Sequence, residues 1–279
     1  MSFVSRYVLF PRRRVSVERL RTAVAGRTVL VTGASYGIGE ATARMLGDAG
    51  AEVLLVARSA DKLAQVAGDI RRRGGRADAY PFDLYRSADV PAFLEGVLAD
   101  HPRVDVVVSN AGKSIRRATV QSAERDDLAR SMALNFTTPS RIVETLLPRL
   151  LAQGGGQVVN VSSVSVRQPS APRWGTYQGT KAGFDVWLRS VANEVRPDGV
   201  AISSVYFPLV RTRMIAPVKA YAHLPALSPA EAAQVIAYAI VTRRDRVAPW
   251  WLWWSELGTL LLRGPIDRVL TRADRPVRR

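Results

Sequence analysis

The chain has 279 residues, of which 47% are hydrophobic, and it contains no cysteine. This length is enough to bury a substantial core, the composition argues against wholesale disorder, and the lack of cysteine excludes disulfides, thiolate metal sites and cysteine nucleophiles. The only two histidines, His101 and His223, lie far apart in the sequence, so we expect no metal site.

The formal net charge of +16 is concentrated at the two ends of the chain. Residues 1–27 hold seven arginines against Glu18, and residues 263–279 hold six arginines against Asp267 and Asp274. Basic ends can bind anionic lipid or nucleic acid, or they can serve solubility alone. No stretch is long enough for a membrane span and no signal peptide is evident, which predicts a cytoplasmic protein with peripheral membrane contact left open.

The middle of the chain alternates short apolar runs with longer amphipathic segments. Five runs are apolar throughout, as strands buried on both faces are, and a further run at 76–84 is weaker. The expected strands are 27–33, 51–58, 76–84, 104–112, 156–163 and 200–208. The expected helices are 38–49, 60–73, 88–99, 124–152, 176–196 and 229–243. This alternation predicts an α/β fold, a doubly wound parallel sheet with helices on both faces.

The simplest organisation is a single domain at 26–248, preceded by a basic N-terminal extension at 1–25 and followed by an appendage at 249–279. The appendage begins "PWWLWWSELGTLLLRG", where four tryptophans fall within five residues. On a helix beginning at Pro249, positions 250, 253, 254, 257, 260 and 261 share one apolar face. With the nearby arginines this face resembles an interfacial membrane anchor. The N-terminal extension likewise has aromatic residues beside arginines. Packing on the domain, or in a dimer interface, is the alternative.

The first expected strand leads into "TGASYGIG" at 32–39, which opens the first expected helix. Gly33, Gly37 and Gly39 allow a tight turn and a close approach of the backbone to a pyrophosphate, which the N-terminus of a helix favours. Such glycine spacing is common by itself, but here the strand–loop–helix context supports a dinucleotide site.

The second expected strand ends with Ala57 and Arg58. Sites that prefer NAD place an acidic residue near this position, whereas an arginine can pair with a 2′-phosphate. We therefore favour NADPH over NADH as the cofactor, with Ser35 and Ser59 as further phosphate donors. The alternative is that Arg58 is a solvated charge at the start of a helix.

The segment "YQGTK" places Tyr177 and Lys181 on one face of an expected helix. A nearby ammonium favours the phenolate and moves the pKa of a tyrosine toward neutral pH, where the tyrosine can act as an acid or base. This spacing arises by chance in many proteins. Its value here comes from the dinucleotide loop upstream, "NAG" at 110–112 and "NVSS" at 160–163.

With these motifs in this order, the chain resembles the short-chain dehydrogenase/reductase family, the large Rossmann-type group, over about 27–248. The resemblance implies catalytic roles for Asn135, Ser163, Tyr177 and Lys181. Tyr177 would protonate a carbonyl oxygen while NADPH delivers hydride, Ser163 would bind the same oxygen, and Asn135 would order a water that relays protons to Lys181. Ser162 is the alternative to Ser163.

The resemblance also implies a set of cofactor-binding residues along the chain. They are Gly33, Ser35, Tyr36, Gly37, Ile38, Gly39, Arg58, Asp83, Leu84, Asn110, Ala111, Gly112, Tyr177, Lys181, Pro208 and Thr212. Two departures from the family stand out. Leu209 occupies a position that is usually glycine, and Tyr36 occupies one that is often arginine in relatives that prefer NADPH.

The segment 208–229 is expected to face the substrate. "PLVRTRMIAP" followed by "LSPAEAA" resembles a branch with fatty acyl-CoA, fatty aldehyde and mycolate-type ketoacyl reductases. This implies a long-chain acyl, aldehyde or 3-oxoacyl substrate, lined by a helix at 209–222. A sterol or retinoid substrate, or a non-catalytic dinucleotide-binding scaffold, is the alternative. We expect no nucleic-acid partner, because no recognition module is present. Relatives associate as homodimers or homotetramers through helices corresponding to 124–152 and 176–196.

Overall fold

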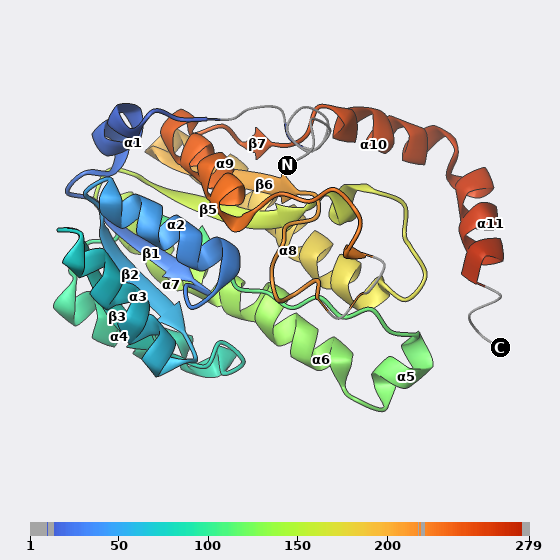
Figure 1. The fold of residues 1–279 in the computed structure, drawn as a ribbon, viewed down its shortest axis with the longest axis horizontal. Coiled ribbons are helices and arrows are strands. Elements are labelled where there is room, and N and C mark those ends of the chain that lie inside the picture. The colour runs from blue at the N-terminus through green and yellow to red at the C-terminus, as the bar shows by residue number, and fades with distance from the viewer. Residues whose placement is uncertain (1–9, 11–13, 217, 219–220, 275–279) are drawn as a thin grey trace.

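A seven-stranded parallel sheet forms the centre of the computed structural model, which describes residues 10, 14–216, 218 and 221–274 (Figure 1). The strand order is β3-β2-β1-β4-β5-β6-β7. The strands are β1 Thr28–Thr32, β2 Glu52–Ala57, β3 Arg76–Pro81, β4 Val106–Ser109, β5 Gly156–Ser163, β6 Val200–Phe207 and β7 Arg246–Val247. All six expected strands are present, and the predicted doubly wound parallel sheet is confirmed. Only the two-residue β7 was not expected.

Helices cover both faces of the sheet and each face has its own hydrophobic core (Figure 1). One core contains α1 Val17–Val24, α2 Gly37–Asp48, α3 Ala60–Arg72 and α9 Pro229–Thr242. The other contains α4 Val90–Asp100, α7 Thr138–Ala152 and α8 Gly175–Val195. Side chains of β1 alternate between the two, with Val29 and Val31 in the first core and Leu30 in the second. This alternation explains why the strands are apolar at every position.

The helix expected at 124–152 is interrupted. Its N-terminal part is α6 Asp127–Met132, which follows the short α5 Thr119–Ala123, and α7 completes it. Between α6 and α7 the chain forms a π-helical turn, Ala133–Thr137. A π turn inside a helix is rare and frequently marks a functional position.

The prediction of a helix at 209–222 is wrong for the residues that the structure describes. The segment instead returns on itself, with a parallel bridge between Val210 and Leu227. The Arg211 guanidinium donates to the carbonyl oxygens of Tyr221 (2.9 Å) and Leu224 (2.5 Å). The local backbone bonds are those of turns, such as Ile215 N–H to the Thr212 carbonyl oxygen at 3.3 Å, and the long-range bonds of Arg211 hold these turns in a loop.

Both terminal segments contain ordered helices. In the N-terminal segment α1 begins at the side-chain cap Ser16 and buries Leu20 and Val24. Phe10 is buried against Phe207, with the ring centroids 5.9 Å apart, and the rest of the N-terminal aromatic run lies outside the described residues. In the C-terminal segment α10 Trp251–Leu261 and α11 Arg263–Asp274 lie beyond the edge of the sheet (Figure 1).

Candidate active site

The loop between β1 and α2 lies where the strand order reverses, at the carboxyl ends of β1 and β4. Gly33 has a φ of +68°, and a Cβ on it would lie 2.9 Å from Nδ2 of Asn110. A Cβ on Gly39 would lie 2.2 Å from the carbonyl oxygen of Gly33. The side chain of Tyr36, the N-cap of α2, caps none of the first N–H groups of that helix. The loop therefore fits a pyrophosphate, which needs close backbone approach and free N–H donors.

Hydrogen bonds join this loop to the segment after β4. The Thr32 hydroxyl accepts from the backbone N–H groups of Asn110 and Ala111, both at 3.0 Å. The Asn110 side chain donates to the Thr32 carbonyl oxygen at 2.9 Å. Gly112 lies close to the proposed catalytic residues, because a Cβ on it would be 3.2 Å from both Asn135 Oδ1 and Lys181 Nζ.

Three basic side chains surround the end of β2 and the loop residue Tyr36. Arg58 is exposed directly after β2. The Arg213 guanidinium lies 3.9 Å from the centre of the Tyr36 ring, and Lys62 Nζ lies 6.0 Å from it. The sequence did not identify Arg213 or Lys62 as residues of the cofactor site. Arg213 reaches the loop from a distant segment, and Lys62 belongs to no motif. This corner of the site is suited to an anion.

The other predicted cofactor residues also line these loops. Ser35 and Ile38 are half-buried in the loop and at the start of α2, and Pro208 is half-buried after β6. Asp83 accepts from the N–H of Tyr85 at 3.1 Å, and the carbonyl oxygen of Leu84 accepts from the Thr138 hydroxyl at 2.7 Å. Thr212 lies against the loop, because a Cβ on Gly37 would be 3.1 Å from its methyl group.

Ser163 and Tyr177 come together from different elements. Ser163 ends β5 and Tyr177 lies in the first turn of α8, and the Ser163 hydroxyl lies close enough to Tyr177 to lower its pKa. The Ser165 hydroxyl donates to Ser163 Oγ at 2.9 Å. Ser162 Oγ is buried with no hydrogen-bond partner among the described residues. The geometry therefore favours Ser163 over Ser162.

Asn135 and Lys181 are both buried beside this pair. Asn135 lies in the π turn, donates to the Lys113 carbonyl oxygen (2.9 Å) and to the Thr180 hydroxyl (3.1 Å), and accepts from the Lys113 N–H (2.8 Å). Lys181 Nζ donates to the Val161 carbonyl oxygen at 3.1 Å. The partners of Asn135 were missed, because the π turn that aims it at them has no signal in the sequence.

Burial has the largest influence on the pKa values of Tyr177 and Lys181. It raises the pKa of Tyr177, opposed by the nearby Ser163 hydroxyl and assisted by the nearby Tyr221. It also lowers the pKa of Lys181 to about 8, opposed by the carboxylate of Asp185. The expected lowering of the tyrosine pKa by the lysine is not among these causes, and that expectation is corrected: in the chain without cofactor, loss of solvation outweighs the other contributions.

Aromatic side chains flank the catalytic candidate Tyr177. The Trp174 ring lies 5.9 Å from the Tyr177 ring and stacks with Tyr221 at 6.4 Å, measured between centroids. We refer to Trp174, Tyr177 and Tyr221 as the aromatic group. Trp174 lies one helical turn before Tyr177, so its spacing could have identified it, whereas Tyr221 comes from the loop that was expected to be a helix.

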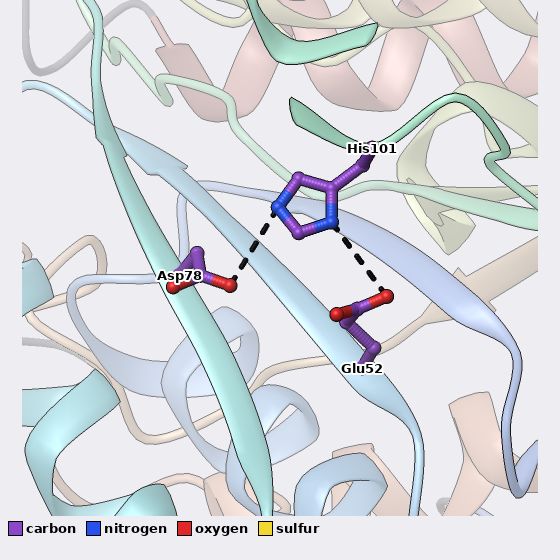
Figure 2. A group of neighbouring side chains, drawn as sticks. All are labelled: Glu52, Asp78 and His101. Atoms are coloured by element: carbon purple, nitrogen blue, oxygen red, sulfur yellow. Dashed lines mark ion pairs between the residues drawn. The ribbon is translucent and has the colours of Figure 1, made fainter. Parts of the chain in front are cut away.

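A separate charged cluster lies near the amino ends of β2 and β3, away from this site (Figure 2). Nδ1 of His101 lies 3.6 Å from a Glu52 oxygen, and Nε2 lies 3.6 Å from an Asp78 oxygen. The two carboxylates therefore face opposite nitrogens of one ring, and Asp78 also pairs with Arg71. This arrangement fits a bridge between strands better than one metal centre, which would need ligands converging on a point.

A family model described as short chain dehydrogenase matches residues 27–222. The chain belongs to the short-chain dehydrogenase family. It is therefore an oxidoreductase with a dinucleotide site, and it acts on a small-molecule substrate.

Two curated relatives carry more specific names. The chain is 42% identical over 229 residues to a fatty acyl-CoA reductase of Acinetobacter baylyi, covering 82% of this chain and 77% of the relative. It is 40% identical over 227 residues to a fatty acyl-CoA reductase of Mycobacterium tuberculosis, covering 81% and 77%. A crystal structure of a metagenomic short-chain oxidoreductase in complex with NADP is also similar, with a TM-score of 0.70, 31% identity, and coverage of 81% of this chain and 97% of that one.

Proposed function

We propose that the protein is an NADPH-dependent reductase of the carbonyl group in a long-chain acyl, aldehyde or 3-oxoacyl substrate. The observation that carries the proposal is the convergence of Ser163 at the end of β5 with Tyr177 in the first turn of α8, with Lys181 one turn further along the same face of α8 and beside Asn135. Together these groups can bind one carbonyl oxygen and give it a proton.

Bound NADPH would supply the hydride that reaches the carbonyl carbon. Tyr177 gives its proton to the carbonyl oxygen, and its raised pKa keeps that proton in place until the oxygen becomes basic. The Ser163 hydroxyl binds the same oxygen and stabilises the charge that develops on it. Lys181 would hold the nicotinamide ribose, and Asn135 would order a water between Lys181 and solvent.

Three cations support NADPH over NADH. Arg58 replaces the acidic residue that would bind a ribose hydroxyl, and Lys62 and Arg213 add positive charge around Tyr36. We expect Arg58→Ala to weaken NADPH binding about tenfold and to leave NADH binding unchanged, because only NADPH carries the 2′-phosphate. Fluorescence titration with both cofactors measures this, with Arg71→Ala in α3 as the control. Equal losses for the two cofactors would contradict the assignment.

The long-chain substrate is supported by the two named relatives and by the apolar surroundings of Tyr177. The loop at 208–229, which supplies Tyr221 to the aromatic group, also carries the exposed apolar side chains of Met214 and Leu224, at 42% and 45%. The test is NADPH oxidation, followed by absorbance, with long-chain acyl-CoAs, aldehydes and 3-oxoacyl compounds. A folded, cofactor-binding protein that turns over only sterols or retinoids would refute the substrate class. One that turns over no carbonyl would be a scaffold.

We further propose a cytoplasmic homodimer or homotetramer that also touches a membrane peripherally. The outer sides of α6 and α8 carry exposed hydrophobic residues, Leu128 and Val186, at 59% and 56%. Light scattering of the full chain measures the assembly, and a monomer at all concentrations would contradict it. In the part of the chain that the structure describes, no helix combines the length and apolar character needed to cross a bilayer.

A further inference from the structure

The C-terminal helix α10 is fixed to the domain by one face. Leu252 has no exposed surface and packs in a small core with Val164 and Tyr206. Glu256, one turn later, accepts two hydrogen bonds from the Arg246 guanidinium, both at 2.9 Å, and lies 3.8 Å from Arg167. Because both contacts come from the domain, α10 has a defined orientation.

The opposite face of α10 is apolar and exposed. At about 100° per residue, six of its side chains fall within a stripe roughly 120° wide. This tryptophan stripe consists of Trp250, Trp253, Trp254, Leu257, Leu260 and Leu261, which are 57%, 62%, 62%, 40%, 78% and 69% exposed. The apolar face expected from the sequence therefore exists, and no described part of the domain covers it. Exposed apolar patches of this kind mark interaction sites.

Positive charge follows the stripe along the chain. Arg263, Arg268 and Arg272 of α11 are all exposed, and the side chain of Arg263 is 83% accessible. In sequence, the segment from 263 to 279 has six arginines and two aspartates. A symmetric contact with a second copy would bring the arginines of both copies into one assembly, and this like charge opposes association. An anionic lipid surface instead neutralises them, and it accepts tryptophan and leucine at its boundary.

The end of α11 returns to the active-site side of the molecule. Arg173 Nε lies 2.9 Å from Asp274 Oδ1, and Arg173 directly precedes Trp174 of the aromatic group. The Arg173 carbonyl oxygen also accepts from the N–H of Arg117 at 2.9 Å. An ion pair thus connects the appendage to the loop that leads into Tyr177.

We propose that the tryptophan stripe docks on an anionic lipid surface and that the Arg173–Asp274 pair orients the aromatic group with respect to that surface. The orienting role rests on the proposed long-chain substrate, which partitions into lipid. Docking itself is independent of that substrate, because the stripe and the arginines bind the surface whether or not turnover follows.

Vesicle co-sedimentation of the full chain tests the docking. We expect phosphatidylcholine vesicles containing phosphatidylglycerol to bind the wild type at least tenfold more tightly than pure phosphatidylcholine, with binding falling as salt increases. Trp253→Glu and Leu260→Glu should each reduce binding to the anionic vesicles about tenfold. Val17→Glu is the matched control, because Val17 is 70% exposed on α1, at the other end of the molecule (Figure 1), and it should bind like the wild type.

Three results would overturn the docking: no binding of the wild type to anionic vesicles, equal losses in Val17→Glu and Leu260→Glu, or a dimer that Leu260→Glu dissociates while vesicle binding is absent. The last result would make the stripe a contact between copies. Unchanged melting temperature and NADPH affinity of the variants establish that they are folded, since the stripe touches neither core nor site.

The orienting role has its own measurement. We expect anionic vesicles to raise turnover of a long-chain substrate by the wild type several-fold, and Arg173→Ala to remove this stimulation while keeping vesicle binding. Stimulation that is equal in Arg173→Ala overturns the orienting role. If no long-chain carbonyl is turned over, the proposed function fails, yet loss of vesicle binding in Leu260→Glu would still support docking.

Discussion

The candidate active site buries polar side chains, whereas the α10–α11 appendage exposes apolar ones. In the site, the fully buried Asn135 uses three hydrogen bonds within the chain. In the appendage, Trp253 and Leu260 are more than half exposed. A buried polar group must be paired because leaving it unpaired costs about 1–3 kcal/mol, whereas an exposed apolar stripe gains free energy only by contact with something outside. The polar groups of Asn135 are therefore satisfied by the chain itself, whereas the apolar face of the appendage is left uncovered by the described residues.

The largest expected effect is on kcat, and it distinguishes the candidate site from the appendage. Tyr177→Phe removes the proton donor, so kcat should fall roughly a thousandfold while NADPH affinity stays within a few-fold. Trp253→Glu in the appendage should leave kcat on a water-soluble short-chain carbonyl unchanged. Steady-state kinetics and cofactor titration measure both. Retained activity in Tyr177→Phe would refute the mechanism, and a large loss in Trp253→Glu would remove the distinction between the two regions.

A change at the phosphate loop should have the next largest effect. In Gly39→Ala the new Cβ would meet the Gly33 carbonyl oxygen at 2.2 Å, so the loop must shift. We expect unfolding free energy to fall by about 1–3 kcal/mol and NADPH to bind more weakly. Denaturant unfolding and cofactor titration measure the change, and wild-type values for both would show that the loop needs no glycine there.

We expect pH to change the activity through groups of the candidate site and not through the appendage. Since the pKa of Lys181 is lowered to about 8, its ammonium is present below that pH and is lost above it. Tyr177, with a raised pKa, remains protonated over the same range. We expect kcat/KM for NADPH to fall roughly tenfold per pH unit above about 8, and Leu260→Glu to show the same profile. Initial rates measure it, and a profile that is flat well above 8 would contradict the role of Lys181.

The smallest effect is expected in the appendage itself. Gly258 lies inside α10 with open space where a Cβ would be. Gly258→Ala should stabilise α10 by about 0.5–1 kcal/mol because the unfolded chain loses freedom and nothing clashes. Amide hydrogen exchange along α10 measures this, with Gly39→Ala as the opposite case. Faster exchange in Gly258→Ala would show that this face of α10 is more crowded than the structure indicates.

Signals that are local in the sequence predicted most of the fold. Strands such as β1 are apolar at every position because they contribute to two cores, and the glycines of the phosphate loop follow a strand and open a helix. The Tyr177–Lys181 spacing predicts a shared helix face, and α8 provides it.

Features that depend on distant contacts could not be predicted. Arg211 holds the loop after β6 through carbonyl oxygens more than nine positions away, so local propensity suggested a helix. The π turn at Asn135 depends on partners at 113 and 180. The raised pKa of Tyr177 comes from burial, which no spacing reveals. The apolar face of α10 was evident, but its exposure required the structure.

The buried carboxylate of Asp185 lies between the candidate site and the contact that holds α10. Asp185 is one turn after Lys181 and raises its pKa, and it accepts from the Tyr206 hydroxyl at 2.8 Å. It also lies 3.2 Å from the Arg167 guanidinium, the same group that reaches Glu256 of α10. The carboxylate that favours the charged form of Lys181 and the contact that holds α10 on the domain therefore share one arginine, Arg167. Loss of Arg167 would remove a contact of both Asp185 and Glu256, so one substitution there would act on the surroundings of Lys181 and on the attachment of α10 together.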